Sequence, residues 1–236
     1  YPHTTIIMNV QEATTRRLPD LKERHLPENC RETINTILKE TYGYEQFRNL
    51  EIYDDLSKGK EKLCISQGQL IENVILEAEK AWKGETQVDN ILLTAPTGSG
   101  KSLLFQLPAI YLGKEYNLLT IVVSPLKALI VDQVESLQEL GYTRVAYASS
   151  DLSPEQKMEV YRQVREGEID LFYLSPELLL SYDIKHFVGE RRIGLVVVDE
   201  AHTVTTWGKE FRVDYWFLGR YLTALKPVSY THLRAH

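Results

Sequence analysis

The chain has 236 residues, of which 43% are hydrophobic and 25% charged, as in an ordinary globular protein with a sizeable core. Its net charge of −6 argues weakly against a protein that coats nucleic acid by bulk electrostatics, without excluding a local basic groove. No run reaches the roughly 18 to 20 apolar residues of a membrane span. Two cysteines are too few for a disulfide framework, so we expect a cytoplasmic protein.

Residues 1–65 form a polar, charged N-terminal segment that we expect to be mostly helical, and one interpretation makes it the end of an upstream domain. Ile34, Ile37 and Leu38 lie at helical spacing and predict a short amphipathic helix over residues 31–42. Residues 54–62 predict an exposed turn or linker.

Strands and helices alternate over residues 66–227. Helices are predicted over residues 70–82, 101–111, 126–140, 154–165 and 212–225. Strands are predicted over residues 90–94, 118–123, 144–148, 171–174 and 193–198. This alternation predicts right-handed βαβ units, and therefore an α/β fold with a parallel sheet and helices on both faces.

Residues 228–236 (VSYTHLRAH) resemble the read-through of a common sequencing-library adapter. The fold prediction therefore omits them, as it would omit any cloning scar. The alternative is an ordinary polar tail.

A glycine-rich segment, residues 95–102 (APTGSGKS), lies between the first of these strands and its helix, as a phosphate-binding loop requires. Gly98 and Gly100 let backbone N–H groups turn toward phosphate oxygens, and the following helix adds its positive dipole end. Lys101 can reach the β- and γ-phosphates, and the Ser102 hydroxyl can ligate Mg²⁺. Ala95 stands where the general pattern has glycine, and a glycine-rich turn with a surface lysine is the alternative. The nucleotide-binding candidates in this loop are Thr97, Gly98, Ser99, Gly100, Lys101 and Ser102.

Two adjacent carboxylates, Asp199 and Glu200, come directly after the buried strand over residues 193–198. Such a strand delivers the residues after it to the carboxyl edge of a parallel sheet, where α/β proteins bind ligands. There Asp199 would hold Mg²⁺ and Glu200 would orient or deprotonate the attacking water. A helix N-cap is the alternative for the pair. Together with the phosphate loop, the pair predicts an ATPase whose cofactors are ATP and Mg²⁺.

Four motifs, APTGSGKS, SPLKALIVDQV, YLSPE and DEAH, occur in this order. With them, residues 66–227 resemble the first RecA-like, P-loop domain of a superfamily 2 helicase. DEAHTVTTWGKEFRVDY, which begins at Asp199, resembles the RecQ family, in which an aromatic-rich loop comes after DEAH. The resemblance implies an ATP-dependent DNA helicase that moves 3′ to 5′ on single-stranded or forked DNA. It implies the catalytic residues Lys101, Asp199, Glu200 and His202. A zinc site at His202 is not expected, because no second His or Cys lies at ligand spacing.

The resemblance also implies that Trp207, Phe211 and Arg212 sense single-stranded DNA and report to Glu200 and His202. Aromatic rings stack on bases at about 1–3 kcal/mol per base without reading their identity, and Arg212 can pair with phosphate. The alternative for the two aromatic residues is packing in the core.

Two further segments would line the track of the nucleic-acid backbone: Ser124, Pro125 and Lys127, and then Ser175 and Pro176. Hydroxyl and N–H groups at strand ends and helix starts suit phosphates, which they position without reading sequence. The two prolines can also be first-turn helix residues, and both interpretations can hold together.

Adenine recognition is assigned to a separate part of the sequence. RecQ proteins carry a stretch like F/Y-G-Y-x-x-F-R followed soon by a glutamine, and residues 42–48 (YGYEQFR) resemble its first part. A glutamine amide can both donate to and accept from an adenine edge. Gln69 is our first candidate and Gln67 the second, after an intervening stretch. Tyr44 and Arg48 are candidates to stack on the base.

Two rival functions stay open. One is an RNA helicase or a double-strand translocase of a defence system, and the other is a nucleotide-gated nucleic-acid-binding module without productive hydrolysis. We expect the sequence to be truncated after the first motor domain, because it lacks the second RecA-like domain, the arginine finger and the third motif that the resemblance implies. Since an arginine finger typically contributes on the order of 10³–10⁵ in rate, we expect this chain alone to bind ATP weakly and hydrolyse it poorly.

Overall fold

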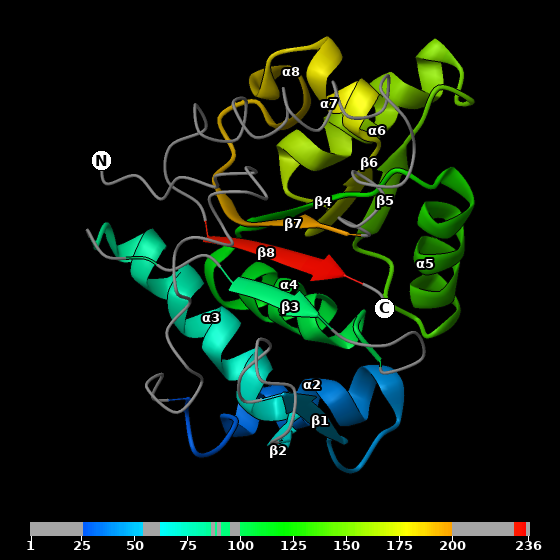
Figure 1. Cartoon of the computed structure of the whole chain (residues 1–236). Helices are drawn as coiled ribbons and strands as arrows, with labels where there is room; N and C mark the ends of the chain where they lie inside the picture. Colours follow the sequence, from blue (N-terminus) through cyan, green and yellow to red (C-terminus); the bar gives the residue numbers. More distant parts are fainter. Residues whose placement is uncertain are drawn as a thin grey trace.

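The computed structural model describes residues 26–53, 62–85, 88, 91–94, 100–199 and 229–234 (Figure 1). Its helices are α2 (Glu32–Tyr42), α3 (Gln67–Lys83), α4 (Leu103–Tyr116), α5 (Lys127–Glu139), α6 (Pro154–Glu166), α7 (Pro176–Ser181) and α8 (Ile184–Val188). Its strands are β1 (Asn49–Tyr53), β2 (Lys62–Ser66), β3 (Ile91–Thr94), β4 (Leu119–Val123), β5 (Val145–Ala148), β6 (Leu171–Leu174), β7 (Ile193–Val198) and β8 (Ser229–Arg234). Among these residues, no helix combines the length and apolar character needed to cross a membrane.

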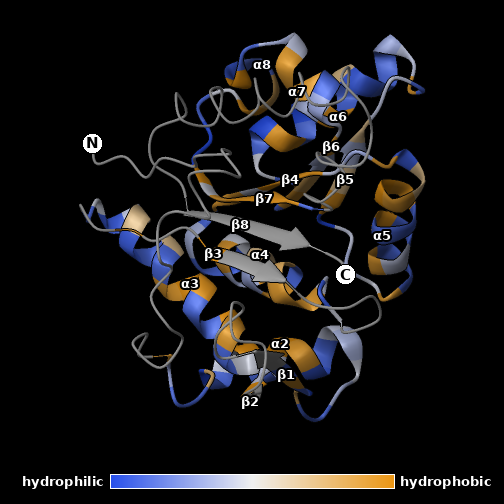
Figure 2. Cartoon of the chain, in the orientation of Figure 1, coloured by the Kyte–Doolittle hydropathy of each residue, from blue (hydrophilic) through white to orange (hydrophobic). Residues whose placement is uncertain are grey.

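A six-stranded sheet forms the centre of the fold, in the order β3-β8-β7-β4-β6-β5. Every neighbouring pair in it is parallel. β4 and β7 are mostly apolar (Figure 2) because both of their faces are covered. The predicted α/β class with a parallel sheet is confirmed.

Two hydrophobic cores lie on opposite faces of this sheet. Leu195 and Val197 of β7 pack with apolar residues of α2, α3, α4 and α5 in the first core. Val196 and Val198 point the other way and pack with apolar residues of α6, α7 and α8. Successive residues of β7 thus pack in different cores. Because both of its faces are buried, the sequence of β7 is a continuous apolar run.

α2 is held against the body of the fold by apolar contacts and by one arginine. Ile34, Ile37 and Leu38 are its buried residues, as their helical spacing predicts. At its N-terminal end the Arg31 guanidinium lies 2.6 Å from Glu72 and 2.7 Å from Glu79, both carboxylates of α3.

An antiparallel hairpin, β1 and β2, comes after α2 and is not part of the prediction for this segment. Its register pairs Asn49 with Ser66 and Leu50 with Ile65, so the end of the hairpin lies beside its beginning. The apolar residues alternate along both strands, and Ile65 is buried in the first core. α8 is likewise absent from the prediction, and α7 enters it only as the helix that Pro176 could begin. The predicted helix over residues 212–225 lies outside the described residues.

β8 lies between β3 and β7 in the sheet and pairs in parallel with both. It is formed by residues 229–234, which the fold prediction omits. Tyr230, Thr231 and Leu233 suit a strand by residue type. The tail therefore takes part in the sheet of this chain.

Candidate functional site

Three of the predicted site segments come after strands that end side by side. In the sheet register Val123 pairs with Leu174 of β6 and with Val198 of β7, so Ser124, Ser175 and Asp199 come directly after neighbouring strand ends. The Asp199 N–H donates to the carbonyl of Val123 at 2.9 Å, and the Ser124 N–H donates to that of Leu174 at 3.1 Å. This edge is where open parallel sheets bind their ligands.

A glycine with a positive φ leads into the start of α4. Gly100 has a φ of +76°, a conformation in which glycine is strongly favoured. After it the backbone winds into the helix, with the Leu103 N–H bonded to the Gly100 carbonyl at 3.2 Å and the Leu104 N–H to that of Lys101 at 3.0 Å. Lys101 and Ser102 therefore stand at the positive end of a helix dipole. The loop candidates Thr97, Gly98 and Ser99 lie outside the described residues.

Asp199 is 4% exposed, and one of its partners is the side chain of Gln133 on α5. The Gln133 amide donates to the Asp199 carboxylate at 3.3 Å. Within the residues described, no group of three or more His, Cys, Asp or Glu side chains could hold a metal by itself. Magnesium nonetheless fits this edge, because it usually takes one or two carboxylates and completes its shell with substrate phosphates and water.

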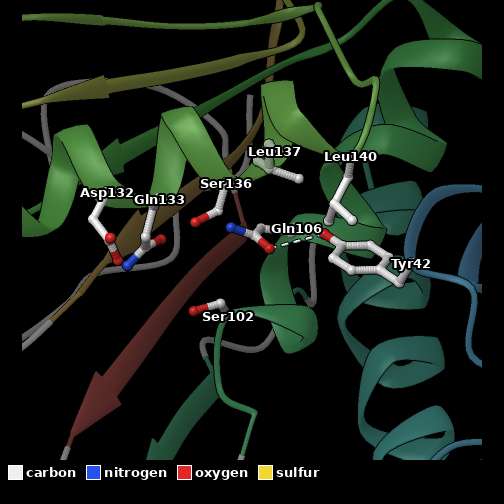
Figure 3. Close-up of a pocket in the computed structure, with 8 residues that line it drawn as sticks. All are labelled: Tyr42, Ser102, Gln106, Asp132, Gln133, Ser136, Leu137 and Leu140. Atoms are coloured by element: carbon white, nitrogen blue, oxygen red, sulfur yellow. Dashed lines mark hydrogen bonds between the residues drawn. The ribbon is translucent and has the colours of Figure 1, made fainter.

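A small polar pocket of about 170 Å³ opens beside the start of α4 (Figure 3). Gln106 of α4 and Ser102, the residue before this helix, face it from one side, and Gln133 of α5 faces it from the other. The full lining is Tyr42, Ser102, Gln106, Asp132, Gln133, Ser136, Leu137 and Leu140. The Mg²⁺ candidate Ser102 and the partner of Asp199 thus border the same space.

The two glutamine candidates for adenine recognition make different contacts. Gln69 belongs to a capping box, in which its side-chain oxygen accepts from the Ser66 N–H at 3.0 Å. Its amide nitrogen donates to the Pro27 carbonyl at 3.0 Å. Both ends of the Gln69 amide are therefore committed to the protein, which disfavours our first candidate.

Gln67 is 1% exposed and its side chain lies against Gly100. A methyl group added at Gly100 would come within 2.7 Å of the Gln67 amide nitrogen. Gln67 also makes two hydrogen bonds with the backbone of Arg48. The Gln67 backbone N–H donates to the Arg48 carbonyl at 2.9 Å, and the Gln67 side-chain oxygen accepts from the Arg48 N–H at 3.2 Å. The hairpin thus brings the glutamine back beside the end of the YGYEQFR stretch. Tyr44 is an exposed aromatic residue whose ring stacks on Tyr42, with centroids 6.3 Å apart.

Three of the candidates to contact the nucleic-acid backbone make contacts within the protein: two lie at the start of a helix, and the third is a lysine paired with a carboxylate. The Ser175 hydroxyl accepts from the Leu178 N–H at 3.3 Å and caps α7, where Pro176 is the first helical residue. The Lys127 ammonium contacts the Ser150 hydroxyl and lies 2.9 Å from the Asp151 carboxylate. The hydrogen bond from Lys127, together with its positive charge, holds the pKa of Asp151 below the ordinary value.

Two other track candidates, Ser124 and Pro125, differ in their surroundings. The buried Ser124 hydroxyl has no hydrogen-bond partner among the described residues. Pro125 precedes the N-cap of α5, Leu126, and so is not in the first turn of that helix. The remaining candidates lie outside the described residues: Glu200, His202, Trp207, Phe211 and Arg212.

The sequence does not identify Gln133, Tyr173 or Gln106 as site residues, although the spacing of Gln133 indicates that it faces the core. Gln133 lies three residues after Ile130 and four before Leu137, which are both core residues of α5. A polar residue at a core-facing helical position must find a buried partner. Only the folded structure identifies that partner.

The model of one protein family, described as DEAD/DEAH box helicase, matches residues 70–229. The ATP-dependent DNA helicase RecQ of Haemophilus influenzae is 30% identical over 79% of this chain, and that of Synechocystis is 34% identical over 80% of it. The alignments cover 25% and 33% of those two proteins, so the chain spans a quarter to a third of their length.

Two solved helicase structures resemble the fold. The DUF1998 helicase MrfA, solved with DNA and AMPPNP, matches with a TM-score of 0.53 and 20% identity, over 90% of this chain and 27% of that one. The helicase domain of Pyrococcus furiosus Hef matches with a TM-score of 0.51 and 22% identity, over 70% of this chain and 32% of that one. At these identities the likeness concerns the fold alone.

Proposed function

Because this chain belongs to the DEAD/DEAH box helicase family, and its sequence is RecQ-like, we propose that it is the first motor domain of an ATP-dependent DNA helicase. The observation that carries the proposal is the meeting of two elements at one sheet edge. The N-terminus of α4 brings Lys101 and Ser102 to this edge, and the end of β7 brings Asp199. A helix dipole for phosphates and a carboxylate for a cation are the two halves of a nucleoside triphosphate site.

Each of these residues has a role that its position supports. Lys101 would neutralise the charge of the β- and γ-phosphates, and the backbone N–H groups after Gly100 would bind their oxygens. Ser102 and Asp199 would hold Mg²⁺, Asp199 through water. The bound ion would supply charge neutralisation and fix the orientation of the phosphates. Glu200 would activate the attacking water.

For adenine recognition we favour Gln67 over Gln69. The Gln67 side chain lies against Gly100, and its oxygen already receives the Arg48 N–H. The Gln69 amide, by contrast, is used at both ends in capping α3 and holding Pro27. Tyr44 and Arg48 belong to the YGYEQFR stretch, whose end pairs with Gln67. A base bound beside Gln67 could stack on either of these two residues.

The nucleic-acid partner that we propose is single-stranded DNA, followed in the 3′ to 5′ direction. The direction rests on the RecQ-like resemblance of the sequence alone, whereas DNA as the partner is supported by the loop after Asp199 and by the relatives named as DNA helicases. In that loop Trp207 and Phe211 would stack on bases, and Arg212 would bind phosphate. Ser124 adds a buried hydroxyl at the same sheet edge. A second RecA-like domain would complete the motor.

The test measures binding of a fluorescent ATP analogue and of labelled oligonucleotides by the 236-residue chain. We expect Mg²⁺-dependent nucleotide binding that is lost in Lys101→Ala. We also expect single-stranded DNA to bind with higher affinity than RNA of the same sequence. Trp207→Ala should weaken DNA binding about five-fold or more, the size of one lost base stack, with nucleotide affinity unchanged.

Two results would redirect the proposal. Equal or tighter binding of RNA would favour the RNA helicase and leave the aromatic loop unexplained. Nucleotide binding that Lys101→Ala does not alter would remove the phosphate loop from the site and overturn the proposal itself.

A further inference from the structure

A continuous chain of four hydrogen bonds crosses the first core and ends at Asp199. The Tyr42 hydroxyl lies 2.8 Å from the Gln106 oxygen, and the Gln106 nitrogen lies 3.2 Å from the Tyr173 hydroxyl (Figure 3 shows the first of these bonds). The Tyr173 hydroxyl lies 3.0 Å from the Gln133 oxygen, and the Gln133 nitrogen lies 3.3 Å from the Asp199 carboxylate. This series of hydrogen bonds joins α2, α4, β6 and α5 to the end of β7.

All four bonds point in one direction, and elementary chemistry requires it. An ionised carboxylate only accepts, so Gln133 must present its N–H₂ to Asp199 and its oxygen to Tyr173. Tyr173 must therefore donate to Gln133, which leaves its oxygen to accept from Gln106. The oxygen of Gln106 then faces Tyr42, which must donate. Each donor–acceptor choice is set by the negative charge at the end of the chain.

Burial makes this arrangement hard to change. Tyr173 is fully buried, and Gln106, Gln133 and Asp199 are almost so. Bonds in such a chain polarise one another, and a member left without its partner is costly in a low-dielectric core. Burial also raises the pKa values of Tyr42 and Tyr173 well above the ordinary value, so both phenols stay protonated donors.

We propose that Gln133 is a positioning residue, which orients the Asp199 carboxylate toward nucleotide-bound Mg²⁺, and that Tyr173, Gln106 and Tyr42 hold Gln133 in that orientation. The inference rests on the proposed function, since it requires Asp199 to face the ion. Partners behind a metal ligand commonly fix its orientation and tune its affinity. The bond from the Gln133 amide to the Asp199 carboxylate is the contact through which this orientation would act.

The test uses the coupling between Mg²⁺ and nucleotide. The affinity of the 236-residue chain for ADP is measured by calorimetry, once with saturating Mg²⁺ and once with EDTA, and the ratio of the two affinities is the coupling. In Tyr173→Phe the ring stays in place but the donor to Gln133 is lost. We expect the coupling to fall about ten-fold, as for other residues behind metal ligands. Gln133→Met should lower it at least as much, and Tyr42→Phe less, because it lies at the far end.

Tyr142→Phe is the matched control. The buried Tyr142 hydroxyl also donates to a carboxylate, that of Asp170 at 3.2 Å, but belongs to a separate cluster. We expect it to lower the melting temperature much as Tyr173→Phe does, while leaving the Mg²⁺ coupling at the unmutated value.

The outcomes distinguish a failure of the proposed function from a failure of the positioning role of Gln133. If the unmutated chain binds ADP with no Mg²⁺ coupling, or if Lys101→Ala changes nothing, the proposed function itself fails. If the unmutated chain shows the coupling but Tyr173→Phe retains it as fully as Tyr142→Phe does, the chain of bonds only stabilises the core and the positioning role is wrong. Should Gln133→Met fail to fold, Tyr173→Phe decides alone.

Discussion

At the scale of single residues, Gln67 and Gln69 show how the direction of a side chain decides its use. They are two positions apart at the start of α3, yet Gln67 lies against Gly100 and Gln69 turns back to cap its own helix. Residues two apart on a helix point to different faces. Type and spacing identified both as candidates, but only the three-dimensional contacts separate them.

Single alanine substitutions test this division. Gln67→Ala should reduce the preference for ATP over GTP about five-fold, because a lost hydrogen bond contributes about 1 kcal/mol. Gln69→Ala should leave that preference intact and lower the free energy of unfolding by about 1 kcal/mol through loss of the capping box. Competition binding gives the first quantity and urea denaturation the second. The reverse pattern, with base preference lost only in Gln69→Ala, would restore Gln69 as the adenine residue.

At the scale of elements, the sequence predicts the buried strands well and the polar connections poorly. β4, β6 and β7 lie within a residue of their predicted bounds, because continuous β-branched and aromatic runs admit few other structures. The β1–β2 hairpin escaped prediction because each strand has only five residues, so that its alternation of aliphatic and other residues is too short to stand out. In the candidate site, Lys101, Ser102 and Asp199 are predictable from local motifs. Gln133 and Tyr173 are not, since their pairing joins positions 40 residues apart.

A buried ion cluster around Asp170 ties together the ends of several elements. Its fully buried carboxylate lies 2.6 Å from the Arg144 guanidinium and 3.0 Å from that of Arg191, which is 4% exposed. Burial lowers the pKa of Arg191, and Asp170 opposes that shift. α4 approaches so closely that a methyl group at Gly113 would come within 2.3 Å of Asp170. Removing the carboxylate charge would leave Arg191 buried and uncompensated.

We therefore expect Asp170→Asn to lower the free energy of unfolding by about 3–5 kcal/mol, the usual cost of breaking a buried ion pair. The matched control is Arg162→Ala on α6, which removes an arginine whose three partners Glu159, Glu166 and Glu168 are all exposed. Its effect should stay below about 1 kcal/mol. Denaturant titration of both variants measures the difference. Equal losses would mean that the Asp170 cluster contributes no more than a surface network.

At the scale of the whole molecule, the described residues make one parallel sheet with a core on each face, and we propose that nucleotide binds at one edge of it. The chain corresponds to about a quarter of the Haemophilus RecQ protein. In motors of the kind that the resemblance implies, a second RecA-like domain contributes an arginine finger across the nucleotide cleft. Binding groups and hydrolytic groups are then divided between two domains, and one domain alone can bind without efficient turnover.

This division predicts the ATPase rate of the 236-residue chain tested alone. We expect turnover lower by about 10³–10⁵ than in a two-domain motor, since that is the usual contribution of an arginine finger. Single-stranded DNA should not restore it, because the stimulating groups would lack their partner. Phosphate release is measured with and without DNA, with Lys101→Ala as the background. Turnover by the chain alone at about 1 s⁻¹ or faster, within the ordinary enzyme range, would contradict the prediction. It would mean that this single domain carries every group that hydrolysis requires.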